Sequence, residues 1–219
     1  SDQERAAHVQ KYFKTGKDEY GEGDVFLGLR VPTIRNIAKK FNTLSMDEAE
    51  EFLQSPYHEE RLFAIFVLID LFEKAKEEDR KKIYILYLKN TKFINNWDLV
   101  DTSAGPIVGA YLFNGDKEPI YILAKSENLW ERRIAIMATF YFITQNEFND
   151  TLKIAEMFLK DQEDLIHKAV GWMLREIGKR NLELEESFLK KHYQNMPRTM
   201  LRYAIEKFPE EKRKSYLKR

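Results

Sequence analysis

The chain has 219 residues, of which 43% are hydrophobic, and its 36 basic and 36 acidic side chains give a formal net charge of zero. This composition excludes a disordered chain, and the neutral charge argues mildly against nucleic-acid binding because such domains are usually basic. The sequence holds no cysteine, which excludes disulfides and thiolate metal sites. With no apolar run as long as a membrane span, we expect a cytoplasmic protein that does not bind membranes.

Helical patterns of apolar residues cover nearly the whole sequence, without the alternation of period two expected of strands. A glycine-rich loop at about residues 16–28 is the main irregular stretch, and Pro32 marks the start of the next helix. Residues 59–74 are too apolar for a surface helix, so we expect them to be buried. Further helical stretches follow at residues 82–89, 107–113, 134–143, 152–159, 165–178 and 199–208.

Small residues recur inside these helices at intervals of 40, 31, 34 and 35, each shortly after a charged residue. The positions are Ala64, Ala104, Ala135, Ala169 and Ala204. Such intervals are typical of stacked HEAT-like helical hairpins, in which equivalent positions line one concave surface. We therefore predict an all-α fold, an α-solenoid or superhelix of HEAT-like hairpin repeats, over an ordinary helical bundle. Since no long linker interrupts the pattern, residues 1–219 are expected to form one domain.

The charge is concentrated near the C-terminus. Residues 198–219 hold eight basic and three acidic groups, so one surface can be positive although the whole chain is neutral. Arg198 and Arg202 are candidate DNA contacts on this surface. The alternative is that the last eight residues of the basic tail (about residues 209–219) are a solvated and fraying helix end.

Trp97 and Asp101 are the first candidate catalytic residues. In a helix they lie at i and i+4 on one face, which places an indole beside a fixed negative charge. That pairing suits a sugar ring that becomes cationic during a reaction. Asp98 is expected to be the first-turn acid, whereas Asp101 precedes residues 104–106, whose glycine and proline should interrupt the helix. The structural alternatives are a core position for Trp97 and an N-cap or salt bridge for Asp101.

Two other stretches combine aromatic and basic side chains. Arg132 and Arg133 open an apolar helix where cations oppose the helix dipole, which suggests an external anion such as phosphate, or else a salt bridge between repeats. Lys168 and Trp172 share a helix face, an arrangement common in nucleic-acid contacts. Between them, Gly171 would let a neighbouring backbone or a ligand come close, and the alternative for Trp172 is a core residue packed over that glycine.

Four motifs carry a resemblance: FLGLRVP at residues 26–32, WDLVD at 97–101, WERRIAI at 130–136 and KAVGWMLRE at 168–176. Together they resemble the AlkD-like DNA alkylation repair family, DNA glycosylases built from HEAT-like repeats, over about residues 10–208. The resemblance implies that Asp101 is the catalytic carboxylate and that Trp97 and Trp172 flank the sugar and phosphate of the damaged nucleotide. It implies a backbone contact for Arg133. Arg30 lies where some members carry an uncharged polar residue, and we add it to the candidate DNA contacts.

The resemblance also implies a substrate: cationic N3- and N7-alkylpurines in double-stranded DNA, excised without base flipping. A cationic base leaves without a general acid, which agrees with four histidines that show neither metal spacing nor triad context. No catalytic lysine amine is evident, so we expect a monofunctional glycosylase. We also expect a monomer that needs no cofactor or metal. Two alternatives remain open: a non-catalytic binder of branched or damaged DNA, and a protein-binding HEAT scaffold.

Overall fold

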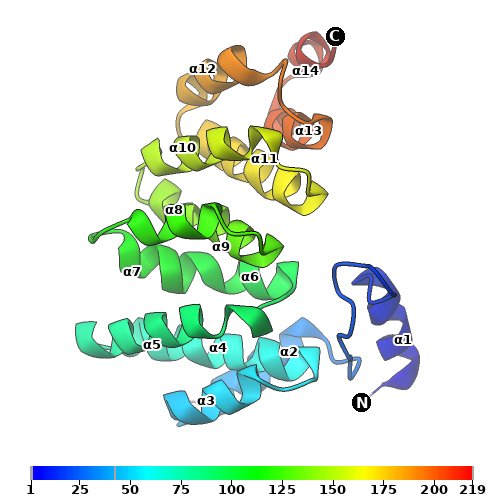
Figure 1. Ribbon diagram of the computed structural model, residues 1–219, viewed down its shortest axis with the longest axis vertical. Coiled ribbons are helices and arrows are strands. Elements are labelled where there is room, and N and C mark those ends of the chain that lie inside the picture. The colour runs from blue at the N-terminus through cyan, green and yellow to red at the C-terminus, as the bar shows by residue number, and fades with distance from the viewer. Residues whose placement is uncertain (1, 42, 219) are drawn as a thin grey trace. The chain divides into compact units, whose positions relative to one another are not determined.

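The computed structural model describes residues 2–41 and 43–218, and the regular structure within them is helical (Figure 1). The predicted all-α class is confirmed. One isolated parallel bridge joins Val25 to Tyr57. The chain divides into two compact units, Ser1–Tyr111 and Leu112–Arg219, so a single domain over residues 1–219 stays a prediction.

The first unit contains most of the irregular backbone. Its helices are α1 (Gln3–Tyr12), α2 (Val31–Lys40), α3 (Met46–Leu53), α4 (His58–Lys74), α5 (Glu77–Lys89) and α6 (Trp97–Ser103), with a 3₁₀ turn at Thr91–Phe93. A π-helical segment, Ala104–Gly109, continues α6, and the short α7 (Ala110–Leu112) follows it. Pro32 lies in the first turn of α2, as predicted.

The second unit consists of helices of different lengths, the longest being α9 and α11. They are α8 (Glu118–Ala124), α9 (Leu129–Thr144), α10 (Asn149–Met157), α11 (Asp164–Gly178), α12 (Leu182–His192), α13 (Arg198–Ala204) and α14 (Glu210–Leu217). Single 3₁₀ turns at Phe158–Lys160 and Ile205–Lys207 end α10 and α13.

The cores of both units form around the apolar helices that the sequence singles out. In the first unit α4 packs against α2, α3, α5 and α6, and in the second unit α9 and α11 pack against each other and against their neighbours. All five recurring alanines have no exposed surface. Small side chains at these buried positions let neighbouring helices approach closely.

The charged residues that precede the alanines do not all reach the surface. Arg61 is 4% exposed and forms an ion pair with Asp24 at 2.5 Å, and Arg133 is also 4% exposed. The expectation that these positions line one surface is therefore wrong for both arginines. A buried guanidinium needs partners for its donors. Arg61 donates to Asp24 and to the carbonyl oxygens of Ser55 and Pro56, although its Nε has no hydrogen-bond partner among the described residues, and Arg133 donates to the carbonyl oxygen of Leu165.

The basic C-terminus is a docked helix, so the expected fraying end is not what the structure shows. Tyr216 of α14 is 9% exposed and its ring contacts Tyr193 and Phe208 at edge-on angles. Arg198 of α13 donates a hydrogen bond to the carbonyl oxygen of Leu217 at 3.1 Å. Both contacts hold α14 against the preceding helices.

A buried carboxylate fixes the irregular segment before α2. Glu59, in the first turn of α4, accepts hydrogen bonds from the backbone N–H groups of Leu27 (2.8 Å), Gly28 (2.8 Å) and Leu29 (3.1 Å). Gly28 has a φ of +82°, and a Cβ atom there would overlap the backbone of Asp2 and Ala6. The segment therefore requires glycine both for its conformation and for the close approach of α1.

None of the helices in residues 2–41 and 43–218 is both long and apolar enough to cross a membrane.

Gly28→Ala should loosen α1. Gly23 is a matched control, because its φ is +86° but a Cβ atom there would have nothing within 4 Å. Both changes cost about 1–2 kcal/mol in backbone strain, and only Gly28→Ala should also raise amide exchange across α1. Equal exchange rates in the two variants would contradict a packing role for Gly28.

Candidate active site

The start of α6 is fixed by Asn96. This side chain is fully buried, accepts a hydrogen bond from the N–H of Trp97 (2.9 Å) and donates one to the carboxylate of Asp24 (3.1 Å). Asp98 accepts from the N–H of Leu99 at 2.9 Å, which is the first-turn role predicted for it. Trp97 and Asp101 lie one turn apart on the same helix, and both are half-buried. The predicted placement of this pair is confirmed.

The helix changes its hydrogen-bonding pattern soon after Asp101. Regular α-helix ends at Ser103, and the next six residues, Ala104–Gly109, form the π-helical segment. Pro106 lies in this segment and has no N–H to donate, which accounts for the widened turn. The predicted interruption is confirmed. Because π-helical turns are frequent at functional sites, this one supports Asp101 as a candidate.

The indole of Trp97 is held by aromatic neighbours from the N-terminal segment. Phe13 stacks on it with ring centroids 5.1 Å apart and an interplanar angle of 6°, and Tyr12 meets it edge-on at 6.2 Å. Tyr12 is 64% exposed. Trp97 is therefore neither a core residue nor a mobile surface side chain, but a half-exposed ring in a fixed orientation.

The negative charge of Asp101 affects the pKa of a buried tyrosine, Tyr87. The hydroxyl of Tyr87 lies 2.8 Å from that of Ser103, which in turn donates to the carbonyl oxygen of Leu99 at 2.6 Å. Burial raises the pKa of Tyr87 far above its usual range, and the negative charge of Asp101 raises it further, against the hydrogen bond to Ser103. Tyr87 is therefore neutral, and its network supports α6 from beneath.

His58 forms hydrogen bonds with two carboxylates that are distant from it in the sequence. Its Nδ1 lies 3.1 Å from Asp24 and its Nε2 lies 2.8 Å from Asp98, while the ring is 2% exposed. Asp24 also pairs with Arg61 and accepts from Asn96. We call these five residues the His58 network. No local pattern predicts this network, because its direct contacts span up to 72 positions and follow no motif spacing.

The charges of the His58 network stabilise one another. Burial alone would lower the pKa of His58, but the hydrogen bonds to Asp24 and Asp98 outweigh this effect and raise the pKa to about 9. Burial also disfavours the charged form of Asp24, and the hydrogen bond from His58 and the charge of Arg61 outweigh it, so its pKa is lowered. His58 is therefore an imidazolium at neutral pH, between two carboxylates.

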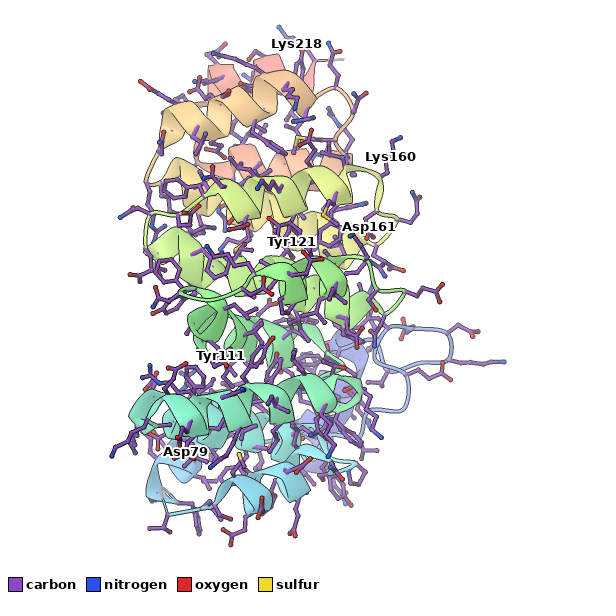
Figure 2. All side chains as sticks on the ribbon, turned by 60° about the vertical axis from the view of Figure 1, so that its left-hand side comes forward. Asp79, Tyr111, Tyr121, Lys160, Asp161 and Lys218 are labelled. Carbon is purple, nitrogen blue, oxygen red and sulfur yellow. The ribbon has the colours of Figure 1, made fainter. Side chains whose placement is uncertain are left out.

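In the second unit, Arg132 forms the salt bridge that was the alternative to an external anion, whereas Arg133 donates to a backbone carbonyl. Arg132 pairs with Asp161 at 2.8 Å and donates to the carbonyl oxygens of Ser126 and Glu127, and Figure 2 shows Asp161 beside Lys160 in the loop after α10. Arg133 donates to the carbonyl oxygen of Leu165. Both side chains thus connect the start of α9 to other segments of the unit.

Trp172 and Lys168 lie on α11 as predicted, one turn apart. The indole N–H of Trp172 donates to Glu176 at 3.2 Å, and Lys168 pairs with Asp164 at 2.7 Å. Trp172 is half-buried, so the alternative of a core tryptophan is not what is found. A Cβ atom on Gly171 would overlap Met200 and Tyr203, so the glycine admits the backbone of α13.

The remaining predicted DNA contacts differ in exposure. Arg30 at the start of α2 and Arg202 on α13 are exposed, whereas Arg198 is half-buried against Leu217. Within residues 2–41 and 43–218, the acidic and histidine side chains form no group of three or more that could hold a metal ion.

Comparison with known families identifies the chain. The family model described as "DNA alkylation repair enzyme" matches residues 1–208. The chain belongs to this family. The resemblance of the four motifs is thereby confirmed, and an enzymatic role in DNA alkylation repair is supported. A search of curated proteins found no match.

Solved structures give the same fold. A predicted DNA alkylation repair enzyme from Enterococcus faecalis is similar with a TM-score of 0.74 and 21% identity, over 96% of this chain and 97% of that one. AlkD2 from Streptococcus mutans is similar with a TM-score of 0.58 and 20% identity, over 96% of this chain and 100% of that one. At these identities the likeness establishes the fold.

The His58 network should make stability depend on pH. The pKa of His58 is higher in the folded protein than in the unfolded chain, so its contribution is complete below pH 6.5 and is lost as the pH rises through about 9. Wild type should lose roughly 2–3 kcal/mol of unfolding free energy between pH 6 and pH 9. Urea unfolding of wild type, His58→Gln and the exposed-residue control His8→Gln tests this. A wild-type profile parallel to that of His58→Gln would contradict it.

Proposed function

We propose that the protein is a monofunctional DNA glycosylase that excises cationic N3- and N7-alkylpurines from duplex DNA without flipping the base. The observation that carries the proposal is the Trp97–Asp101 pair, half-exposed on one face of α6 directly before a π-helical segment. Membership of the DNA alkylation repair enzyme family supports a role in alkylation repair, and the glycosylase reaction itself is our proposal.

The chemistry needs little beyond a fixed carboxylate. An N3- or N7-alkylated purine already carries positive charge, so it departs as a neutral base without protonation. The sugar that remains becomes oxocarbenium-like, and the carboxylate of Asp101 stabilises that charge electrostatically. Asp101 also orients the water that attacks the anomeric carbon. Because one carboxylate performs both steps, the reaction requires neither a catalytic histidine nor a lysine.

Trp97 provides the surface beside this carboxylate. Phe13 covers one face of the indole and keeps the ring from turning, so the ring presents the same surface to the sugar in each turnover. An aromatic ring also attracts the sugar more strongly as positive charge develops on it. Trp97 therefore contributes more to the transition state than to binding of intact DNA.

Contacts to the DNA backbone come from both units. Arg30 and Arg202 are the exposed members of the predicted set, and we assign them phosphate contacts. Trp172 and Lys168 are proposed to contact the DNA on the family resemblance. For Arg132 and Arg198, the proposed contact would be made by guanidinium donors other than those that hold the helices. Arg133 is 4% exposed, so we do not assign it a phosphate contact.

Asp101→Asn tests the chemistry. The change removes the negative charge and keeps the shape, so the single-turnover rate of 7-methylguanine release from duplex DNA should fall by at least about 10²-fold. Affinity for undamaged duplex should change little. The matched control is Asp79→Asn, an exposed carboxylate on α5 that pairs with Lys82 (Figure 2). If the wild-type protein binds damaged DNA without releasing the base, the alternative of a non-catalytic DNA-binding protein is favoured instead.

Arg30→Ala and Arg202→Ala test the phosphate contacts. Each should lower affinity for duplex DNA whatever its sequence, and each should reduce the slope of log affinity against log salt by about 1. Lys82→Ala is the control, an exposed cation paired with Asp79. Fluorescence anisotropy between 50 and about 200 mM salt measures the slope. A wild-type protein without DNA affinity would favour the protein-binding scaffold.

A further inference from the structure

The His58 network connects the candidate catalytic helix to two other parts of the first unit. Asp98 and Asn96 belong to the start of α6, Asp24 to the segment before α2, and His58 and Arg61 to the first turn of α4. Phe13 and Phe26 lie against the imidazole, with ring centroids 5.1 and 4.5 Å away. Phe13 is also the ring that stacks on Trp97.

Helix α6 depends on such anchors because it is short. It has seven residues and passes directly into the π-helical segment, and a helix of this length has no stability of its own in water. Its first turn is held by Asn96 and by the bond between Asp98 and His58. Asp101 lies one turn further along. A shift of the first turn therefore moves Asp101 and Trp97 together.

The proton on His58 decides whether this anchor holds. With it, the buried charges balance: two carboxylates face one imidazolium and Arg61. Without it, one nitrogen of His58 presents a lone pair to a carboxylate, and that buried contact becomes repulsive. The charged groups facing His58 are Asp24 from the N-terminal segment and Asp98 from α6, while Arg61, on α4 itself, reaches it through Asp24.

We propose that His58 is a positioning residue of the glycosylase site, whose imidazolium fixes α6 and so sets the placement of Asp101 and Trp97. This inference rests on the proposed function. His58 is 2% exposed, so we assign it no direct contact with DNA or with the reacting atoms. It acts through Asp98 on the geometry of the transition state, where a displacement of about 1 Å can cost about 10²-fold in rate.

The first experiment measures single-turnover release of 7-methylguanine between pH 6 and 10. His58→Gln should be slower than wild type by about 10- to 100-fold at pH 7, with affinity for undamaged duplex within about threefold. The release rate of the wild-type protein should fall toward that of His58→Gln as the pH passes about 9, where His58 deprotonates. His58→Arg keeps a cation that can pair with both carboxylates, so it should restore the rate and abolish this decline.

A control variant and a check of folding accompany this experiment. His8→Gln, at an exposed histidine, should follow wild type at every pH. Circular dichroism at each pH confirms that the variants compared are folded, and if His58→Gln does not fold, wild type and His58→Arg still give the pH dependence. Equal profiles for wild type and His58→Gln, or a pH decline that persists in His58→Arg, would overturn the proposal.

A second measurement separates this inference from the proposed function. With 5-fluorotryptophan in the protein, the ¹⁹F resonance of Trp97 should shift with a midpoint near pH 9 in wild type and not in His58→Gln. The resonances of Trp130 and Trp172, in the other unit, serve as internal references. A shift without base release would refute the glycosylase and leave the coupling of His58 to α6 intact. A Trp97 resonance that does not titrate would refute the coupling.

Discussion

The first unit depends on one set of buried charges at the start of α4. Removing a charged side chain from water costs several kcal/mol, and only a partner in good geometry offsets that cost. Asp24, His58, Arg61 and Asp98 meet this condition jointly, because each cation faces a carboxylate and the sum of their charges is zero. Removal of any one leaves an uncompensated buried charge next to the start of α6.

The same turn of α4 also organises the backbone around it. Glu59 accepts three backbone hydrogen bonds from residues 27–29, while His58 reaches α6. The rest of α4 is apolar and buried, which anchors this polar turn. The helix thus combines two tasks: its body forms the core of the unit, and its first turn ties the N-terminal segment to the candidate catalytic helix.

Periodicity and small-residue spacing were enough to predict the all-α class, the apolar helices α4, α9 and α11, the buried alanines and the common face of Trp97 and Asp101, because each follows from local geometry. The more polar helices α1, α3, α8 and α12 were not singled out. The His58 network follows from tertiary contacts across 34 to 72 positions, which no local pattern encodes. Arg132 and Arg133 illustrate the same limit. Their place at a helix start indicates a nearby anion or acceptor, but only the fold reveals that Asp161 and the carbonyl oxygen of Leu165 supply it.

Electrostatic catalysis by a single carboxylate also requires that its surroundings add no competing charge. A network with no net charge beneath α6 contributes little potential at the sugar, so the field there is dominated by Asp101. Were His58 neutral, the same network would carry a net negative charge one turn from Asp101, and the repulsion would act on the helix that must stay fixed. Preorganisation is effective only when the charged group does not move as the reaction proceeds. The imidazolium therefore serves stability and the proposed chemistry through one contact, that between His58 and Asp98.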